Sequence, residues 1–494
     1  MKQFIKTFIW LLIFSSLSLA QQSKPPLADT PSKNQIANEK SMSADRPPEI
    51  TSVVDAALTA PPEFGSDVLI RLAQSNRIKD SRWKRELLEE AFNLAAKSEQ
   101  KTKQTYFGTV ADTREGYLGL ALAENIDALS LQVKVVAAML DIDKTRAREL
   151  FLQIPEPDRP TLTCDAALVP DVTQFYLVLK RIVNEAFTAN ETANGGALWF
   201  LQKYVQGIRS PVQVGPLAQT IAGLNLPAAQ MTVLIQSFSD SLKRVSGDFR
   251  TFISATSRDR VAQSFGNLSQ VCDKLGIPKQ YLAQSLRAFI VSNFAAVQCT
   301  DERVQPTKGV PGFVAVINRD LLRAAPISTE DILGSGVGPD TQTHPFWESS
   351  KSKNILNKLR KLRFGADGQP RTDAEKATDD WHQSLTQFLN ELDEWTASDE
   401  PSEVDYFHEK AIMYRVLSDI IPNGLMRDNI WRENATFLAN GYLPNNRIEW
   451  FMHAKHFLDR INSLKGNERG EFIGILKASS NPVLRAYAYL SELS

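Results

Sequence analysis

The stretch LSLQVKVVAAML-DID-KTRARELFLQI, residues 129–154, decides the fold class of this chain. Residues 129–140 and 144–154 are each long enough for a helix of about three turns. Asp141-Ile-Asp143 leaves only a tight turn between them. So short a connection forces the two helices to lie antiparallel and in contact. We therefore expect a helical hairpin here and a chain built from such pairs.

Helical periodicity of the apolar residues continues from about residue 50 to the end of the sequence. Residues 112–115, Asp-Thr-Arg-Glu, predict a helix start with Asp112 as the cap and Glu115 three residues later. The most strand-like run, residues 313–317, leads into Asn318-Arg-Asp and is interpreted as the start of a helix. A helix near residues 376–395 has one apolar stripe, formed by Trp381, Leu385, Phe388, Leu389, Leu392 and Trp395. The predicted fold is all-α and multi-helix, with stacked antiparallel helix pairs, solenoid-like, in two regions.

Residues 472–493 resemble one unit of a HEAT-type helical repeat. An apolar run from Phe472 is followed by a turn at Ser479-Ser-Asn481 and a second run from Pro482. Asn481 is a favoured cap, and proline suits the first helical position because its missing N–H costs nothing there. The resemblance implies stacked helix pairs, although no clean period recurs elsewhere in the sequence.

The first 20 residues have the pattern of a secretory signal peptide. Lys2 and Lys6 precede an apolar run from Thr7 to Phe14, and Ser18-Leu19-Ala20 offers small residues for cleavage before Gln21. An uncleaved membrane anchor is the alternative, but the apolar run falls short of the roughly 20 residues that span a bilayer. We expect an exported protein, periplasmic or extracellular, without a transmembrane segment in the mature chain.

Composition divides the rest of the chain. Residues 21–48 are polar and proline-rich, which predicts a disordered leader. Glycine- and proline-rich stretches within 301–346 predict a loop-rich connection between helical regions at 50–300 and 347–494. The formal net charge of −1 becomes −3 when Lys2 and Lys6 are removed, so the chain lacks the basic surface that nucleic acid requires. We expect no nucleic-acid partner.

Three cysteines are present, and export would allow them to oxidise. Cys272 falls on an apolar helical stripe, where a free thiol behaves as a small hydrophobic group. Cys164 and Cys299 both lie in predicted loops. If the chain has a disulfide, we expect it between Cys164 and Cys299; a chain with no disulfide is the alternative.

The sequence contains no recognisable catalytic, cofactor or metal motif. His453 and His456 are three residues apart on a predicted helix and are expected on its solvated surface, without the further ligands that zinc needs. His408-Glu409 lacks the second histidine of a metalloprotease helix. The glycines at 334, 336 and 338 follow no predicted strand and are interpreted as a flexible loop. We expect no cofactor and no metal.

Charge and tryptophan are concentrated in the C-terminal region. Six basic residues between 351 and 363 precede twelve acidic residues between Asp373 and Glu409. The basic helix suggests docking on anionic lipid or an acidic partner, but the favoured interpretation is that the two blocks face each other or solvent. Tryptophans at 347, 381, 395, 431 and 450 accompany acids at 379, 380, 391, 393 and 394, as in carbohydrate-binding clefts.

Taken together, the sequence predicts an exported helical scaffold or interaction module whose partner is most simply another protein. The alternative is an envelope or extracellular hydrolase that acts on glycans through carboxylates of the C-terminal region. The two hypotheses differ in geometry: a hydrolase needs two converging carboxylates beside exposed aromatic rings, whereas a scaffold needs only an open surface.

Overall fold

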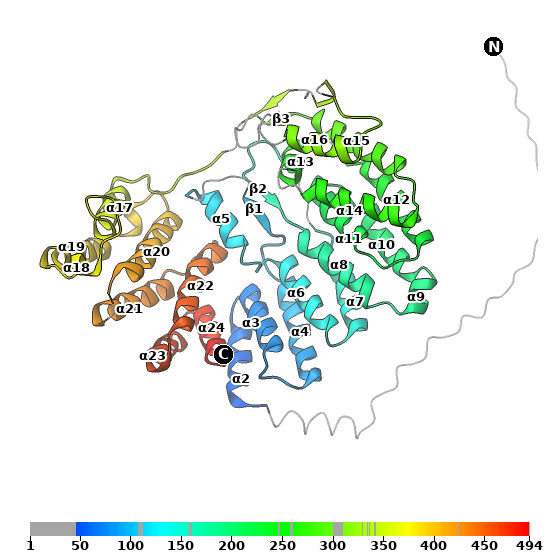
Figure 1. Ribbon diagram of the computed structural model, residues 1–494. Helices are drawn as coiled ribbons and strands as arrows, with labels where there is room; N and C mark the ends of the chain where they lie inside the picture. Colours follow the sequence, from blue (N-terminus) through cyan, green and yellow to red (C-terminus); the bar gives the residue numbers. More distant parts are fainter. Residues whose placement is uncertain are drawn as a thin grey trace, which may run out of the picture. The chain divides into compact units, whose positions relative to one another are not determined.

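The computed structural model describes residues 46–493 except 107–111, 158–160, 246–247, 257–259, 300–309, 329, 333, 335, 340–341 and 423. The predicted signal peptide and residues 21–45 of the predicted leader lie outside the described residues. Within the described part, 23 α-helices and four short strands confirm the all-α, multi-helix prediction (Figure 1). No described helix has the length and apolarity required to cross a membrane.

The first part of the chain forms the blue and cyan helices of Figure 1. They are α2 (Pro48–Thr59), α3 (Pro62–Gln74), α4 (Ser81–Ala96), α5 (Arg114–Leu122), α6 (Ala128–Leu140) and α7 (Lys144–Gln153). The predicted hairpin is present as α6 and α7, which pack together. Asp143 ends the turn because its carboxylate accepts a hydrogen bond from the N–H of Arg146, which caps α7.

The middle of the chain continues the stacking. Its helices are α8 (Thr173–Glu185), α9 (Ala189–Ala193), α10 (Gly196–Gln206), α11 (Pro211–Ala222), α12 (Ala228–Leu242), α13 (Phe249–Thr256), α14 (Arg260–Leu275), α15 (Gln280–Phe294) and α16 (Val310–Asp320). One row of contacts runs α4, α6, α8, α11, α14, α16, and a second runs α10, α12, α15. The strand-like run at 313–317 is helical, as predicted.

The C-terminal part forms the yellow to red helices of Figure 1. They are α17 (Ser350–Arg363), α18 (Asp373–Lys376), α19 (Asp379–Glu394), α20 (Glu403–Ile420), α21 (Leu425–Asn440), α22 (Arg447–Ser463), α23 (Gly466–Lys477) and α24 (Pro482–Leu493), with 3₁₀ turns η2 (Glu330–Ile332) and η3 (Ala397–Asp399). In the HEAT-like stretch, α23 packs on α24, and the side chain of Asn481 accepts hydrogen bonds from the N–H groups of Val483 and Leu484. Asn481 therefore caps α24 as expected.

Two pairs of short strands join segments that are distant in the sequence. β1 (Gln104–Tyr106) pairs antiparallel with β2 (Leu168–Pro170), and β3 (Gln298–Cys299) pairs parallel with β4 (Val337–Gly338). Helix α5 lies directly on β1: a Cβ atom at Gly119 would stand 2.6 Å from the Cβ of Tyr106. Only glycine permits this approach. Helix α5 also contacts α22 of the C-terminal part.

The predicted cap of α5 is wrong by one residue. Thr113, not Asp112, accepts the capping hydrogen bond from the N–H of Gly116. The carboxylate of Asp112 instead accepts a hydrogen bond from the indole N–H of Trp347, at 3.0 Å. Aspartate and threonine are both good caps, so the local sequence could not decide between them.

The hydrophobic side chains form two clusters. The larger contains residues from Ile50 to Ile327 and again from Phe407 to Ala488, and the smaller contains residues from Phe346 to Ile430. Helix α20 contributes to both, because Phe407 belongs to the larger cluster and Met413 to the smaller. The proposed division of the chain at residues 301–346 stays a prediction.

The structure joins Cys164 to Cys299 by a disulfide and leaves Cys272 as a buried free thiol. The bond links the segment before β2 to strand β3 across 135 residues of sequence. A cross-link of this kind removes conformational freedom from the unfolded chain.

The disulfide gives a first prediction. The double variant Cys164→Ser/Cys299→Ser should lose about 2–4 kcal/mol of unfolding free energy, measured by urea denaturation. In denaturant without reductant, the unmodified protein should expose one reactive thiol, and after reduction three, since the chain has three cysteines. Three reactive thiols before reduction would contradict the pairing. Cys272→Ala is the control, and it should remove the single thiol seen without reductant.

Candidate functional site

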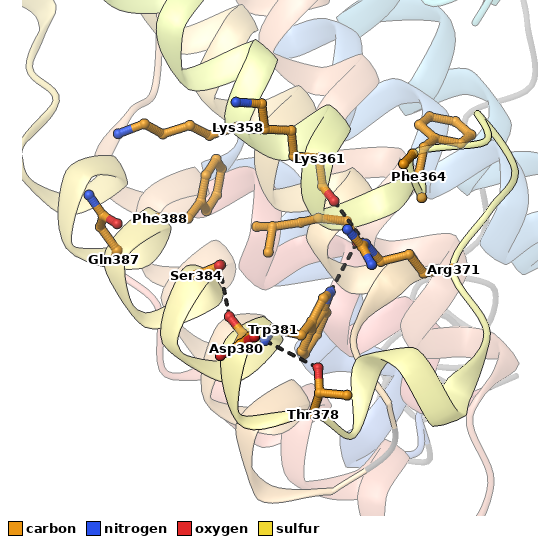
Figure 2. A pocket seen from close by; sticks show the side chains of 13 residues that line it. Lys358, Lys361, Phe364, Arg371, Thr378, Asp380, Trp381, Ser384, Gln387 and Phe388 are labelled. Carbon is orange, nitrogen blue, oxygen red and sulfur yellow. Dashed lines mark hydrogen bonds between the residues drawn. The ribbon is translucent and has the colours of Figure 1, made fainter.

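A groove of about 660 Å³ lies between α17 and α19 (Figure 2). Helix α17 carries the basic cluster, and α19 carries Trp381 and the five acids that the hydrolase hypothesis names. We call this space the α17–α19 groove. Its lining residues are Lys358, Lys361, Leu362, Phe364, Gly365, Ala366, Arg371, Thr378, Asp380, Trp381, Ser384, Gln387 and Phe388.

Amphipathic patterning positions the two walls of the groove. Ile355, Leu359 and Leu362 of α17 are buried against the apolar stripe of α19, and both helices contribute to the smaller hydrophobic cluster. Ser349 caps α17 and Thr378 caps α19 through hydrogen bonds from backbone N–H groups. This packing buries the apolar faces of α17 and α19, so polar side chains of both helices remain along the groove.

A turn after α17 carries a third cation back to the groove. Gly368 has φ +75°, a conformation that favours glycine, and the N–H of Gly365 donates to the carbonyl of Gln369. The N–H of Arg371 then donates to the carbonyl of Arg363, at 2.9 Å. The Nε of Arg371 also donates to the carbonyl of Lys361, so the guanidinium lies at the end of α17 beside Trp381, as Figure 2 shows.

The charges of the groove are only partly paired. Lys358 forms an ion pair with Glu391 of α19, which fits the interpretation that the basic and acidic blocks face each other. In the part of the chain that the structure describes, Lys361 and Arg371 form no ion pair. Asp380 is the one carboxylate among the lining residues, so the groove has a positive excess.

The tryptophans of the C-terminal region are buried. Trp381 is 4% exposed and Trp395 is 0% exposed, and their indole N–H groups donate to the carbonyl of Leu362 and the carboxylate of Glu400. Trp347, Trp431 and Trp450 are buried as well. These rings stabilise the core and offer no open face on which a sugar could stack.

The acids named by the hydrolase hypothesis do not converge on the groove. Asp379, Asp393 and Glu394 are exposed and absent from its lining, and Glu391 is held by Lys358. Asp380 therefore faces no second carboxylate among the described lining residues. The hydrolase hypothesis still rests on the acids and tryptophans of the sequence, but the described lining of the groove provides no second carboxylate to act with Asp380.

A second polar group, missed from the sequence, is buried around α20. The Nδ1 of His408 and the Nε2 of His453 are 2.9 Å apart in one hydrogen bond, and the two side chains are 3% and 7% exposed. The prediction that His453 lies on the surface is wrong, whereas His456 is exposed. The reason is packing: α22 contacts α5, α20, α21, α23 and α24, so positions outside its main apolar stripe are covered too.

Burial decides the protonation of these groups. It lowers the pKa of His408 well below its usual value and, with the charge of Arg415, lowers the pKa of His453 to about 3. Both rings are therefore neutral near pH 7. On the next residue of α20, burial raises the pKa of Glu409 to about 8, which leaves this carboxyl group protonated at neutral pH.

Glu409 holds the segment that precedes α17. Its carboxyl oxygen accepts a hydrogen bond from the N–H of Trp347, at 2.5 Å. Trp347 has φ +62°, which is unfavourable for a residue with a side chain and needs such contacts to persist. Within the described residues, no cluster of three or more metal-ligating side chains occurs here or elsewhere.

Comparison of the chain with protein-family models, with curated proteins and with solved structures gave no match. The functional argument therefore rests on the geometry of the chain itself.

The buried carboxyl group gives a prediction for pH dependence. Native Glu409 keeps its proton up to a pKa of about 8, whereas in the unfolded chain it titrates near its ordinary value of 4.5. Between these values the native state binds more protons, so raising the pH destabilises it. The unfolding free energy of Glu409→Gln minus that of the unmodified protein should therefore increase with pH, by at most about 1.4 kcal/mol per pH unit. This difference should become constant above pH 8.

Urea denaturation between pH 4.5 and 9 measures this difference. Glu394→Gln, which removes an exposed carboxylate, is the control for loss of surface charge. A difference between Glu409→Gln and the unmodified protein that stays constant across this range would contradict a raised pKa for Glu409.

Proposed function

We propose that this protein is an exported helical interaction module that binds an acidic, extended segment of a protein partner in the α17–α19 groove. The observation that carries the proposal is the positive excess of the groove: within the described residues Lys361 and Arg371 form no ion pair, Glu375 near Arg371 is outside the lining, and Asp380 is the one carboxylate of the lining. Unpaired cations at the edge of a groove attract an acidic chain and favour its rapid, salt-dependent association.

The shape of the groove favours a peptide over other anions. Its volume of about 660 Å³ accommodates several residues of an extended chain. Single-stranded nucleic acid would need open aromatic faces for base stacking, and Trp381 is only 4% exposed. A membrane-bound α17 would need a free apolar face, whereas its Ile355 and Leu359 are in the core.

The chain's own leader is a poor occupant. Residues 21–45 contain three lysines and three acidic residues, so this segment has no negative excess to match the groove. A separate acidic partner matches the charge of the groove better.

Export forms the second part of the proposal. The charged start, short apolar run and small residues at 18 and 20 support a cleaved signal peptide, which would place the protein in the periplasm or outside the cell. The bond between Cys164 and Cys299 is compatible with such an oxidising compartment.

Binding of an acidic peptide tests the function of the groove. A fluorescein-labelled peptide of alternating Glu and Gly should bind, and fluorescence anisotropy should show an affinity that falls with added salt. Lys361→Gln should weaken binding by about fivefold to tenfold, and Lys361→Gln/Arg371→Gln by more, since each removes a charge that faces the ligand.

Lys353→Gln provides a matched control, because Lys353 is an exposed lysine of the same helix outside the groove lining. It should leave peptide affinity nearly unchanged. The proposal fails if Lys353→Gln and Lys361→Gln weaken binding equally, or if a Lys-Gly peptide of the same length binds as well as the Glu-Gly peptide.

Processing of the N-terminus tests export. In cells of the natural host, mass spectrometry of the purified protein should find a mature chain that begins at Gln21, outside the cytoplasm. Ala20→Leu should block cleavage, because the residue before the cut must be small. Ala28→Leu, a matched substitution beyond the cleavage point, should be processed normally. A cytoplasmic protein that retains residues 1–20 would contradict the proposal.

A further inference from the structure

A second cavity, of about 800 Å³, lies among the first helices of the chain. Helices α4, α6 and α7 pack together in this region (Figure 1). One wall of the cavity is the C-terminal half of α4, another is the start of α6, and the end of α7 with residues 155–157 borders both. Its lining shares no residue with that of the α17–α19 groove. We call this space the α4–α6 cavity.

Hydrogen bonds to the first turn of α6 fix the segment that connects the two walls. The N–H of Ala128 donates to the carbonyl of Gln100, at 2.8 Å, and the N–H of Leu129 donates to the carbonyl of Lys101, at 3.0 Å. The ammonium group of Lys101 donates to the carbonyl of Ser98, at 2.6 Å. The fold itself therefore holds this part of the lining in place, and such preorganisation lowers the cost of binding a ligand.

A buried side-chain amide in this lining lacks a partner. Gln132 of α6 is 3% exposed, and its side chain forms no hydrogen bond among the described residues. Both of its amide atoms are nevertheless reached by solvent, and the cavity that Gln132 lines is the open space beside them. A largely desolvated amide without a partner is costly, so a bound molecule gains affinity by supplying one.

Three polar side chains follow one face of α4 along the cavity, namely Glu90, Asn93 and Lys97. Lys97 directly follows α4 and keeps helical backbone angles, with φ −86° and ψ −9°. Seven residues make almost two full turns, so Glu90 and Lys97 face the same side of the helix, about 10 Å apart along its axis. They are too far apart to pair with each other, and neither forms an ion pair elsewhere in the described part of the chain.

The cavity has charges of both signs in equal number. Among its lining residues, Glu90 and Glu156 balance Lys97 and Lys101. An acidic or a basic chain therefore gains no net attraction there, in contrast to the α17–α19 groove. A neutral sugar would leave the charges at both ends unmatched, and Phe92, the aromatic residue of the lining, is only 4% exposed. The complement of this cavity is a molecule with a positive charge at one end and a negative charge at the other.

We propose that the α4–α6 cavity binds a short peptide with free ends, about three residues long. Its ammonium group lies on Glu90 and its carboxylate on Lys97. An extended chain of three residues spans about 10 Å, which matches the separation of these two side chains. A side-chain amide has one carbonyl and one NH₂ group, so Gln132 pairs with a carbonyl or an N–H of the peptide backbone. The inference is independent of the α17–α19 groove and of export.

Trialanine is the probe, because it has both charged ends and no charged side chain. Isothermal titration calorimetry with the full chain should detect its binding. N-acetyl-trialanine lacks the ammonium group and trialanine amide lacks the carboxylate, so each should bind about tenfold more weakly. The peptide blocked at both ends should not bind detectably, and neither should maltotriose, a neutral sugar of three units.

Variants assign each end of the peptide. Glu90→Gln should weaken trialanine binding about tenfold but leave the affinity for N-acetyl-trialanine unchanged, because that peptide has no ammonium group. Lys97→Gln should likewise weaken trialanine binding and leave the affinity for trialanine amide unchanged. Gln132→Leu should weaken all three peptides by a similar factor, since it removes a contact to the backbone. Circular dichroism and the melting temperature show that each variant is folded.

Glu86→Gln is the matched control, because Glu86 is an exposed carboxylate of α4 outside the cavity lining. It should leave trialanine affinity unchanged. The inference is overturned by any of four results: no binding of trialanine to the folded protein, equal affinity for trialanine and the doubly blocked peptide, equal effects of Glu86→Gln and Glu90→Gln, or binding of maltotriose in place of trialanine. Lys361→Gln, which tests the α17–α19 groove, should leave trialanine affinity unchanged, so the two proposals can fail separately.

Discussion

The structure depends on the burial of polar side chains along α20. Asp405, His408, Glu409 and Lys410 are each 6% exposed or less. Removing such groups from water is costly unless every one is hydrogen-bonded. Their partners are Arg114 of α5, His453 of α22, the N–H of Trp347 before α17, and the carbonyl of Trp395 after α19. Four segments are therefore each tied by a hydrogen bond to a buried polar side chain of α20.

One of the two proposed sites follows from this constraint. The α17–α19 groove exists because these helices pack their apolar faces with α20 in one hydrophobic cluster and leave Lys361 and Arg371 at the edge. The α4–α6 cavity is formed by the first helices of the chain, and no described residue of its lining belongs to α20. The disulfide joins the segment before β2 to β3, and β1, on which α5 packs, pairs with β2.

The sequence predicted features that depend on local pattern. The α6–α7 hairpin, the stripe from Trp381 to Leu392 and the cap at Asn481 each depend on spacing within one or two helices, and each is present. The sequence pattern wrongly predicted His453 at the surface and did not indicate the buried polar side chains of α20. Both features depend on long-range contacts: Arg114 and Asp405, for example, are 291 residues apart. Helix α20 is covered on several sides, so its sequence has no clear polar face. Aspartate, glutamate and lysine are residue types usually found at the surface, although here Asp405, Glu409 and Lys410 are buried, as is His408.

A near-neutral net charge conceals where this chain can bind. Lys358 is cancelled by Glu391, and Arg114 by Asp405, within the fold. When such internal pairs are set aside, Lys361 and Arg371 remain without an ion pair at the α17–α19 groove, within the described residues. These unmatched groups, and not the total charge, set the chemistry of a ligand. An acidic peptide is the complement of these two cations, which is why a chain of nearly neutral total charge is expected to bind a ligand of one sign at this groove.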